Sequence, residues 1–280
     1  MTKIESFYFT SSDNVKLHYL KAGSGPPLVI LPGWTQPASG FSKVIACLAD
    51  SYQCFALDYR AHGKSAKPNY GYRLSRLTKD CHDFLNHIKL KKVVLLGHSA
   101  GCAVIWNLID LYGENQIRAL VLCDQMITRI KHPDWSEAKC QLYGAAVTGD
   151  EALEQAATLA GPDGGAMLSN FLTSEFSKEF SSTEIEKIVE NSLKVPRSYA
   201  AELMLSITYA DYRDLLPRIS CPTLCIGGQQ SHLGPKVMPW IASQIPNGRV
   251  AMLNGRHFMY VENSVEFNKT ILKFLSEMSY

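Results

Sequence analysis

The strongest chemical signal in the sequence is a short glycine-flanked segment near its middle. Residues 97–101 read Gly-His-Ser-Ala-Gly, follow an apolar run at 93–96 and open a helical pattern. Glycine at both ends permits a sharp, crowded turn from strand to helix, which pushes the Ser99 hydroxyl into a cleft. A helix N-terminus also favours the negative charge that develops during attack. The segment therefore predicts a nucleophilic serine.

Ser99 needs a base, because a serine hydroxyl is a weak nucleophile at neutral pH. His257 is the best candidate, since it follows an apolar run at 250–253 and precedes the last helical pattern. The other histidines lack this placement: His98 lies within the predicted serine turn and His62 within another turn. We therefore expect His257 to take the serine proton and later return it.

Together these features resemble the α/β-hydrolase family. The likeness is carried by the Gly-x-Ser-x-Gly segment between a strand and a helix and by a histidine ahead of the last helix. It implies Ser99 as nucleophile, His257 as base, and an oxyanion hole made by the backbone N–H groups of Ala100 and Trp34. One such donor is commonly worth about 3–4 kcal/mol. The Trp34 loop, Leu-Pro-Gly-Trp at 31–34, matches the family's His-Gly-x loop except that Pro32 replaces the histidine.

The acid departs from the commonest pattern of the family. It usually follows the strand that corresponds to 223–226, yet the loop 227–235 contains no carboxylate and has Ser231 near the expected place. Asp124 ends the preceding strand, where a minority of the family carries the acid, and it retains the chain order Ser, Asp, His. We therefore predict that Asp124 orients His257. The alternative is that Asp124 caps the next turn.

The elements that must position these residues alternate along the chain. Short apolar runs bounded by Gly, Pro or Asp are separated by amphipathic stretches, which predicts an α/β protein with a mostly parallel sheet covered by helices on both faces. The eight predicted strands are 7–10, 16–22, 27–31, 52–57, 93–96, 119–123, 223–226 and 249–253. The predicted helices are 41–49, 74–88, 99–112, 236–244 and 265–278. With the resemblance, this pattern indicates an α/β-hydrolase fold.

Residues 125–215 break the alternation, because they hold short amphipathic helices interrupted by glycine and proline. They are predicted to form a helical cap inserted after the sixth strand, between core segments 1–124 and 216–280. A cap that starts at the carboxyl end of a strand should roof the ligand site. The candidates for substrate contact are Trp34, His98, Trp135, Tyr143, Phe171 and Met204, each with the alternative of packing in the core of the cap.

The amino-acid composition limits the kinds of molecule that we expect the protein to bind. The 280 residues are 46% hydrophobic and 19% charged, and 28 basic residues nearly balance 26 acidic ones. That balance is typical of a globular protein without a nucleic-acid partner. Residues 1–13 lack the apolar stretch of ~7–15 residues of a secretory signal, and no run approaches the ~20 residues that span a bilayer. We therefore expect a cytoplasmic protein that does not contact membranes.

Cofactors and metals are not expected either. The eight cysteines form no CxxC pair and are predicted to be reduced core residues, and the glycines at 161–165 lack the strand and spacing of a dinucleotide loop. The expected partner is a small-molecule substrate. The sequence leaves the oligomeric state open.

Three functions remain in competition. The first is hydrolysis of a small ester, lactone or related acyl compound through an acyl-enzyme on Ser99. The second comes from a resemblance to cofactor-free dioxygenases that cleave 3-hydroxy-4-quinolones: Gly33-Trp34, Asp124 and the missing later acid are similar, and a His257–Asp124 base would deprotonate the substrate while Ser99 only hydrogen-bonds. The third is a hydrolase-fold receptor for a small molecule, against which the intact serine and histidine argue.

Overall fold

An eight-stranded, mostly parallel sheet flanked by helices forms the centre of the molecule, as predicted. The computed structural model describes residues 3–278, so the first two residues of the N-terminal segment discussed above lie outside the described residues. The strand order is β1-β2-β4-β3-β5-β6-β7-β8; β2 pairs antiparallel with β1 and β4, and the other pairs are parallel. The strands are β1 (Glu5–Thr10), β2 (Lys16–Ala22), β3 (Pro27–Leu31), β4 (Gln53–Leu57), β5 (Val93–His98), β6 (Ile117–Cys123), β7 (Thr223–Gly228) and β8 (Gly248–Leu253).

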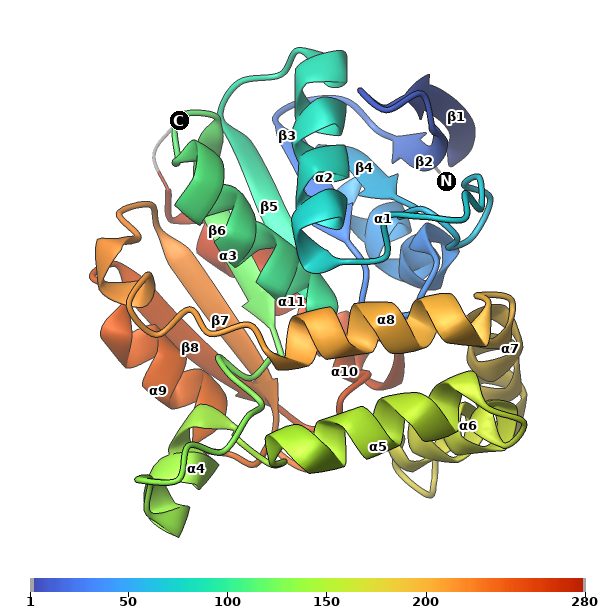
Figure 1. Cartoon of the computed structure of the whole chain (residues 1–280). Coiled ribbons are helices and arrows are strands. Elements are labelled where there is room, and N and C mark those ends of the chain that lie inside the picture. The colour runs from blue at the N-terminus through green and yellow to red at the C-terminus, as the bar shows by residue number, and fades with distance from the viewer. Residues whose placement is uncertain (1–2, 279–280) are drawn as a thin grey trace.

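Alternation along each strand builds a hydrophobic core on both faces of the sheet. In β3, Val29 and Leu31 belong to one core, whereas Leu28 and Ile30 belong to the other. The first core is closed by α2 (Leu74–Ile88), α3 (Ala100–Tyr112) and α9 (Val237–Gln244). The second is closed by α1 (Ser42–Leu48) and α11 (Ser264–Ser276), which lie behind the sheet in Figure 1.

Five α-helices follow β6 and lie across the carboxyl ends of the central strands (Figure 1). They are α4 (Glu137–Tyr143), α5 (Gly149–Ala160), α6 (Gly164–Ser174), α7 (Ser182–Leu193) and α8 (Arg197–Thr208). We call the segment from 125 to 215 that carries them the cap. Two isolated bridges, Thr128 with Asp211 and Ile130 with Val147, tie the start of the cap to its later parts.

The predicted boundaries differ from the structure mainly at glycines and in short elements. β5 and β7 run through Gly97 and Gly228, which the sequence pattern treats as strand ends. Space requires a glycine at position 228, since a Cβ there would lie 2.4 Å from the Arg256 carbonyl oxygen. The 3-10 helices η1 (Ala38–Phe41) and η2 (Leu216–Arg218) and the four-residue α10 (Met259–Glu262) are too short for a periodic signal.

Within residues 3–278, no helix has both the length and the apolar character needed to cross a membrane.

Candidate active site

Ser99 occupies a strained turn between β5 and α3. Its φ of 52° and ψ of −123° fall outside the helical and extended regions, and its backbone N–H donates to the Cys123 carbonyl at 2.8 Å. The glycines are required by space: a Cβ on Gly101 would lie 2.0 Å from the Leu31 carbonyl oxygen, and one on Gly97 would lie 2.7 Å from the Cys102 nitrogen. The turn therefore holds the hydroxyl at the carboxyl edge of the sheet, as the motif predicts.

Asp124 and His257 meet at the same edge. Asp124 directly follows β6, and its Oδ2 lies 2.7 Å from His257 Nδ1. The buried carboxylate also accepts from the Ser231 hydroxyl at 2.6 Å and from the Gly228 N–H at 3.1 Å. The side chain of Asp124 thus bonds to the loops after β7 and β8 rather than to its own following turn. Because Nδ1 faces a carboxylate it carries the proton, which leaves Nε2 as the acceptor.

Ser231 explains why the loop after β7 can lack a carboxylate. Its hydroxyl and Asp124 Oδ2 are within hydrogen-bond distance, so the position after β7 and the position after β6 converge on one place. A single acid at 124 reaches His257 from there.

Burial sets the protonation states of this pair. It lowers the pKa of His257, the electrostatic interaction with His232 lowers it further, and the interaction with Glu175 opposes both. Burial raises the pKa of Asp124, whereas the hydrogen bonds from Ser231 and Gly228 lower it. The resting imidazole is therefore neutral, which is the form that accepts a proton.

His98 supports the loop that carries His257. Its buried Nε2 lies 2.9 Å from the His257 carbonyl oxygen, so Nε2 must be the protonated nitrogen. Burial lowers the pKa of His98 to about 3, which keeps the ring neutral. The His98 side chain thereby holds the backbone of His257 at the carboxyl edge of the sheet.

Trp34 and Ala100, whose backbone N–H groups are predicted to form the oxyanion hole, line the same cavity as Ser99. Within residues 3–278, neither the N–H of Trp34 nor that of Ala100 donates to another residue. Gly33 brings the Trp34 loop close, since a Cβ on Gly33 would lie 3.3 Å from the Ser99 Cβ. The Trp34 indole faces the cap, and its Nε1 donates to the Ala200 carbonyl of α8 at 2.9 Å.

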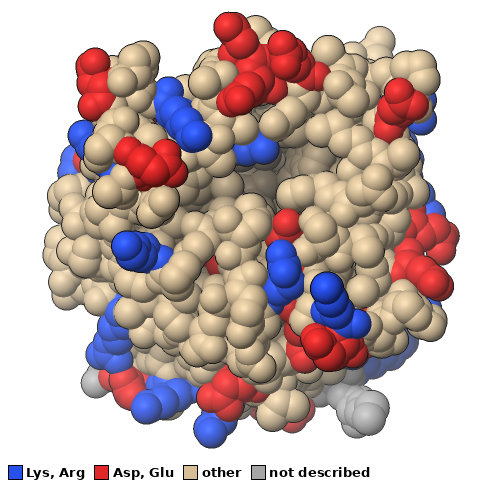
Figure 2. Space-filling model, turned by 90° about the horizontal axis from the view of Figure 1, so that it is seen from below, with Lys and Arg blue, Asp and Glu red and all other residues tan. Residues whose placement is uncertain are grey.

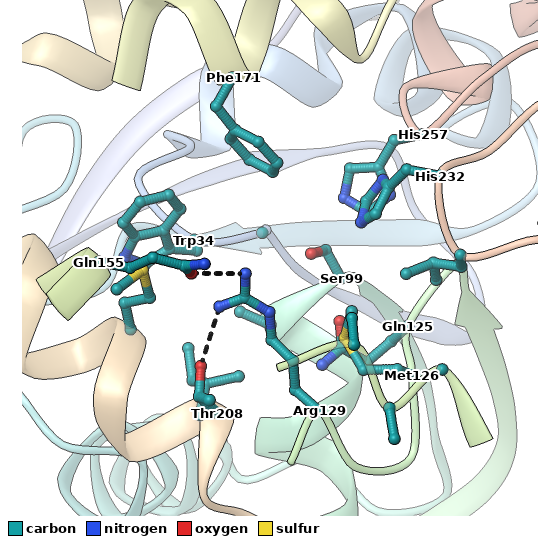
Figure 3. A pocket seen from close by; sticks show the side chains of 18 of the residues that line it. Trp34, Ser99, Gln125, Met126, Arg129, Gln155, Phe171, Thr208, His232 and His257 are labelled. Carbon is teal, nitrogen blue, oxygen red and sulfur yellow. Dashed lines mark hydrogen bonds between the residues drawn. The ribbon is translucent and has the colours of Figure 1, made fainter. Parts of the chain in front are cut away.

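These groups share one cavity of about 590 Å³ between core and cap. Ser99, His257 and Ala100 line it, and so do four of the six side chains named for substrate contact: Trp34, His98, Phe171 and Met204. Figure 3 shows Ser99, His257, Trp34 and Phe171 directed toward the same space. The face of the molecule seen in Figure 2 is hollowed, with acidic side chains at the upper rim and basic atoms inside the hollow.

The structure places Trp135 and Tyr143 outside the lining of this cavity. Their rings contact each other edge to face at 4.9 Å, and Tyr143 also packs on Trp240 at 4.6 Å. The guanidinium of Arg213 lies over the Trp135 ring at 4.4 Å. These two half-buried aromatic residues therefore pack where α4 meets α9. Neither the predicted substrate contact nor the alternative of a place in the core of the cap describes them.

Sequence reasoning missed several polar residues of the cavity region, among them His232, Glu175 and Arg129. His232, from the loop after β7, lies 5.1 Å from the His257 ring, and its Nδ1 lies 2.6 Å from an Oε2 of the buried Glu175. Arg129, from the first cap segment, lines the cavity as well. In the sequence, only their location pointed to the site. His232 lies in the loop after β7, where an acid was expected, and Arg129 lies shortly after Asp124.

Glu175, His232 and His257 could also be considered as metal ligands, because their nearest ligand atoms lie within 4.8 Å of one another. Both imidazoles, however, already use Nδ1 for a carboxylate. Hydrogen bonding accounts for this cluster without a cation.

Comparisons with known proteins agree with this architecture. A family model described as "alpha/beta hydrolase fold" matches residues 26–264. A putative non-heme chloroperoxidase of Synechocystis is 24% identical and aligns over 95% of this chain and 96% of its own. An esterase from Exiguobacterium antarcticum superposes with a TM-score of 0.88 at 23% identity, covering 96% of this chain and 99% of the other. An enol-lactonase from Burkholderia xenovorans gives 0.82 at 22%, covering 97% and 98%.

Proposed function

The chain belongs to the α/β-hydrolase fold family, and from that premise we propose that it is a serine hydrolase of a small ester, lactone or related acyl substrate. The observation that carries the proposal is the 2.7 Å contact between Asp124 Oδ2 and His257 Nδ1, where His257 lines the same cavity as Ser99. Nucleophile, orienting acid and base thus follow β5, β6 and β8, whose carboxyl ends lie at the same edge of the sheet.

The proposed reaction has two halves. His257 Nε2 takes the Ser99 proton as the oxygen attacks the acyl carbon, and the N–H groups of Trp34 and Ala100 receive the negative charge on the carbonyl oxygen. The tetrahedral intermediate collapses, His257 gives its proton to the leaving alcohol, and an acyl-enzyme remains. A water then attacks, loses its proton to His257, and the acid is released as Ser99 regains a proton.

The substrate class draws support from similar proteins. One structurally similar protein is an esterase and another an enol-lactonase, and both names describe acyl transfer to water. The chloroperoxidase name belongs to a different reaction class. Ester hydrolysis would use the neutral His257 imidazole as the base and the N–H groups of Trp34 and Ala100 as hydrogen-bond donors. It needs no reactant other than the substrate and water.

The direct test is turnover of p-nitrophenyl acetate by the wild type and by Ser99→Ala. We expect release of nitrophenol to fall by about 10³-fold or more in the variant. A fluorophosphonate should modify Ser99 and no other serine, as read by peptide mass. Labelling of a different serine would remove Ser99 from the mechanism. Oxygen uptake with a 3-hydroxy-4-quinolone that survives Ser99→Ala would favour the ring-cleaving alternative.

A further inference from the structure

The cavity holds a positive charge that the proposed reaction does not use. Arg129 lines the same space as Ser99, and Figure 3 shows its guanidinium within the cavity, near Thr208 and Gln155. In the part of the chain that the structure describes, Arg129 forms no ion pair. Its side-chain bonds go to neutral groups, from Nη1 to Thr208 Oγ1 at 3.3 Å and from Nη2 to Gln155 Oε1 at 3.0 Å.

The backbone around Arg129 is fixed. Its carbonyl accepts from the N–H groups of Ala146 and Val147 at 2.9 and 3.2 Å, and the next residue, Ile130, bridges to Val147. Thr208 and Gln155 come from α8 and α5, so two cap helices aim the guanidinium. A side chain held in this way is ready to bind a ligand with little loss of conformational freedom.

The donors of Arg129 are only partly used. A guanidinium has five N–H donors in a planar fork, and two of them serve Thr208 and Gln155. Burial lowers the pKa of Arg129, because the charged form loses hydration there. The Arg129 side chain is half-buried, and a partly desolvated charge without a counterion is costly, so such a charge is normally paired. The missing partner is an anion.

We propose that Arg129 binds a carboxylate of the substrate, so that the ester or lactone cleaved at Ser99 is itself an acid. The proposal rests on the hydrolase function proposed above and names its substrate class. A carboxylate matches the planar fork in shape, and a single negative charge matches a single guanidinium.

The rest of the cavity fits such a substrate. Most of its lining is apolar, with Phe171, Met204 and Leu159 among the residues, which suits a carbon chain between the two polar ends. Two other charged residues line it, Lys131 and Glu137, and they offset each other in sign. The net charge of these three side chains is therefore positive, and it is contributed by Arg129.

The test compares two substrates that differ in charge and little in shape, monomethyl adipate and dimethyl adipate. Methanol release gives kcat/KM for each. We expect the wild type to prefer the monoester by about 10- to 100-fold, the range of a charge-assisted hydrogen bond. Equal kcat/KM values, or a preference for the diester, would overturn the proposal while leaving the hydrolase function intact.

Variants assign the preference to one residue. Arg129→Gln should lower kcat/KM for the monoester much more than for the diester, so that the preference falls to about 3-fold or less. Arg129→Lys keeps the charge but lacks the fork, so it should recover part of the preference. Lys187→Met removes an exposed positive charge from α7 and should behave as the wild type. A preference that survives both Arg129 variants would overturn the assignment.

A binding measurement separates this proposal from the proposed function. Calorimetry with adipate on Ser99→Ala, which is expected not to turn over, should give a Kd about 10- to 100-fold lower than on Ser99→Ala/Arg129→Gln. This outcome supports the carboxylate site even if methyl esters prove not to be hydrolysed. Inorganic phosphate that binds more tightly than adipate in an Arg129-dependent way would replace the carboxylate with a phosphoryl group and overturn the proposal as stated.

Discussion

At the scale of single residues, Asp124 depends on its backbone as much as on its carboxylate. Its φ is 50°, in the left-handed region that few side chains other than Asn and Asp tolerate. That conformation turns the side chain toward the loops after β7 and β8. It also means that asparagine is the substitution that preserves local geometry.

Asp124→Asn should therefore leave the fold intact and lower kcat for p-nitrophenyl acetate by about 10³- to 10⁴-fold. The amide can present its NH₂ to His257 Nδ1, which favours the tautomer that cannot accept the serine proton at Nε2. Asp134→Asn, at an exposed position in the cap, is the matched control. A near-normal rate would place the acid elsewhere.

His232 tunes the neighbouring base. The electrostatic interaction with His232 lowers the pKa of His257, and the interaction with Glu175 raises it. In His232→Gln the first effect disappears and the second remains, so the pKa of His257 should rise. Because the base must be neutral, the acidic limb of the kcat/KM profile should move to higher pH. Lys236→Gln, which removes an exposed charge on the same loop, should leave the limb in place; a limb that moves downward in His232→Gln would contradict this account.

At the scale of elements, a buried ion cluster joins α2 to the turn between β1 and β2. Arg60 is fully buried, and its Nε and Nη2 donate to Asp80 of α2 at 2.8 Å each. Its Nη2 also donates to Asp13 at 3.0 Å. The cluster fixes α2, which packs against α3, the helix that begins directly after Ser99.

Asp80→Asn leaves the Arg60 charge buried with a weakened partner. We expect it to lower the free energy of unfolding by about 3 kcal/mol. Asp110→Asn breaks the exposed pair with Arg218 and should cost less than about 1 kcal/mol. Urea denaturation of both variants measures the difference, and equal midpoints would mean that the buried cluster contributes no more than a surface pair.

Most elements could be predicted from the sequence because each has its own period. α2 begins and ends where the apolar spacing indicates, and the turn at Ser99 follows from its glycines. The pairs Glu175–His232 and Arg129–Gln155 could not be predicted, since each joins residues whose proximity depends on how the helices pack. Trp135 and Tyr143 show the same limit: aromatic residues in a cap look alike whether they face a ligand or α9.

At the scale of the whole molecule, Glu262 links the cap to the catalytic loop. Its Oε1 accepts from the N–H and the hydroxyl of Ser177 at 2.7 and 2.6 Å, and its Oε2 accepts from the Arg256 N–H at 2.7 Å. Arg256 directly precedes His257. The position of the cap and the position of the base are therefore joined through one carboxylate.

Glu262→Ala should loosen both sides of this link. We expect hydrogen exchange at the Ser177 amide to accelerate and kcat to fall by about 10-fold, the scale of one lost charged hydrogen bond. Glu266→Ala, on α11 with only a 3.8 Å pair to Lys269, is the control. Faster exchange at Ser177 with an unchanged kcat would mean that the contact of Glu262 with the cap does not affect His257.

Trp34 gives the cap a second route to the chemistry. Its indole Nε1 donates a hydrogen bond to the Ala200 carbonyl of α8. Its backbone N–H is the group proposed above to donate to the carbonyl oxygen of the substrate. A long acyl chain that displaced α8 would pull on this amide during both acylation and deacylation. Chain length would thus be discriminated in the turnover number as well as in binding, so selectivity should persist at saturating substrate.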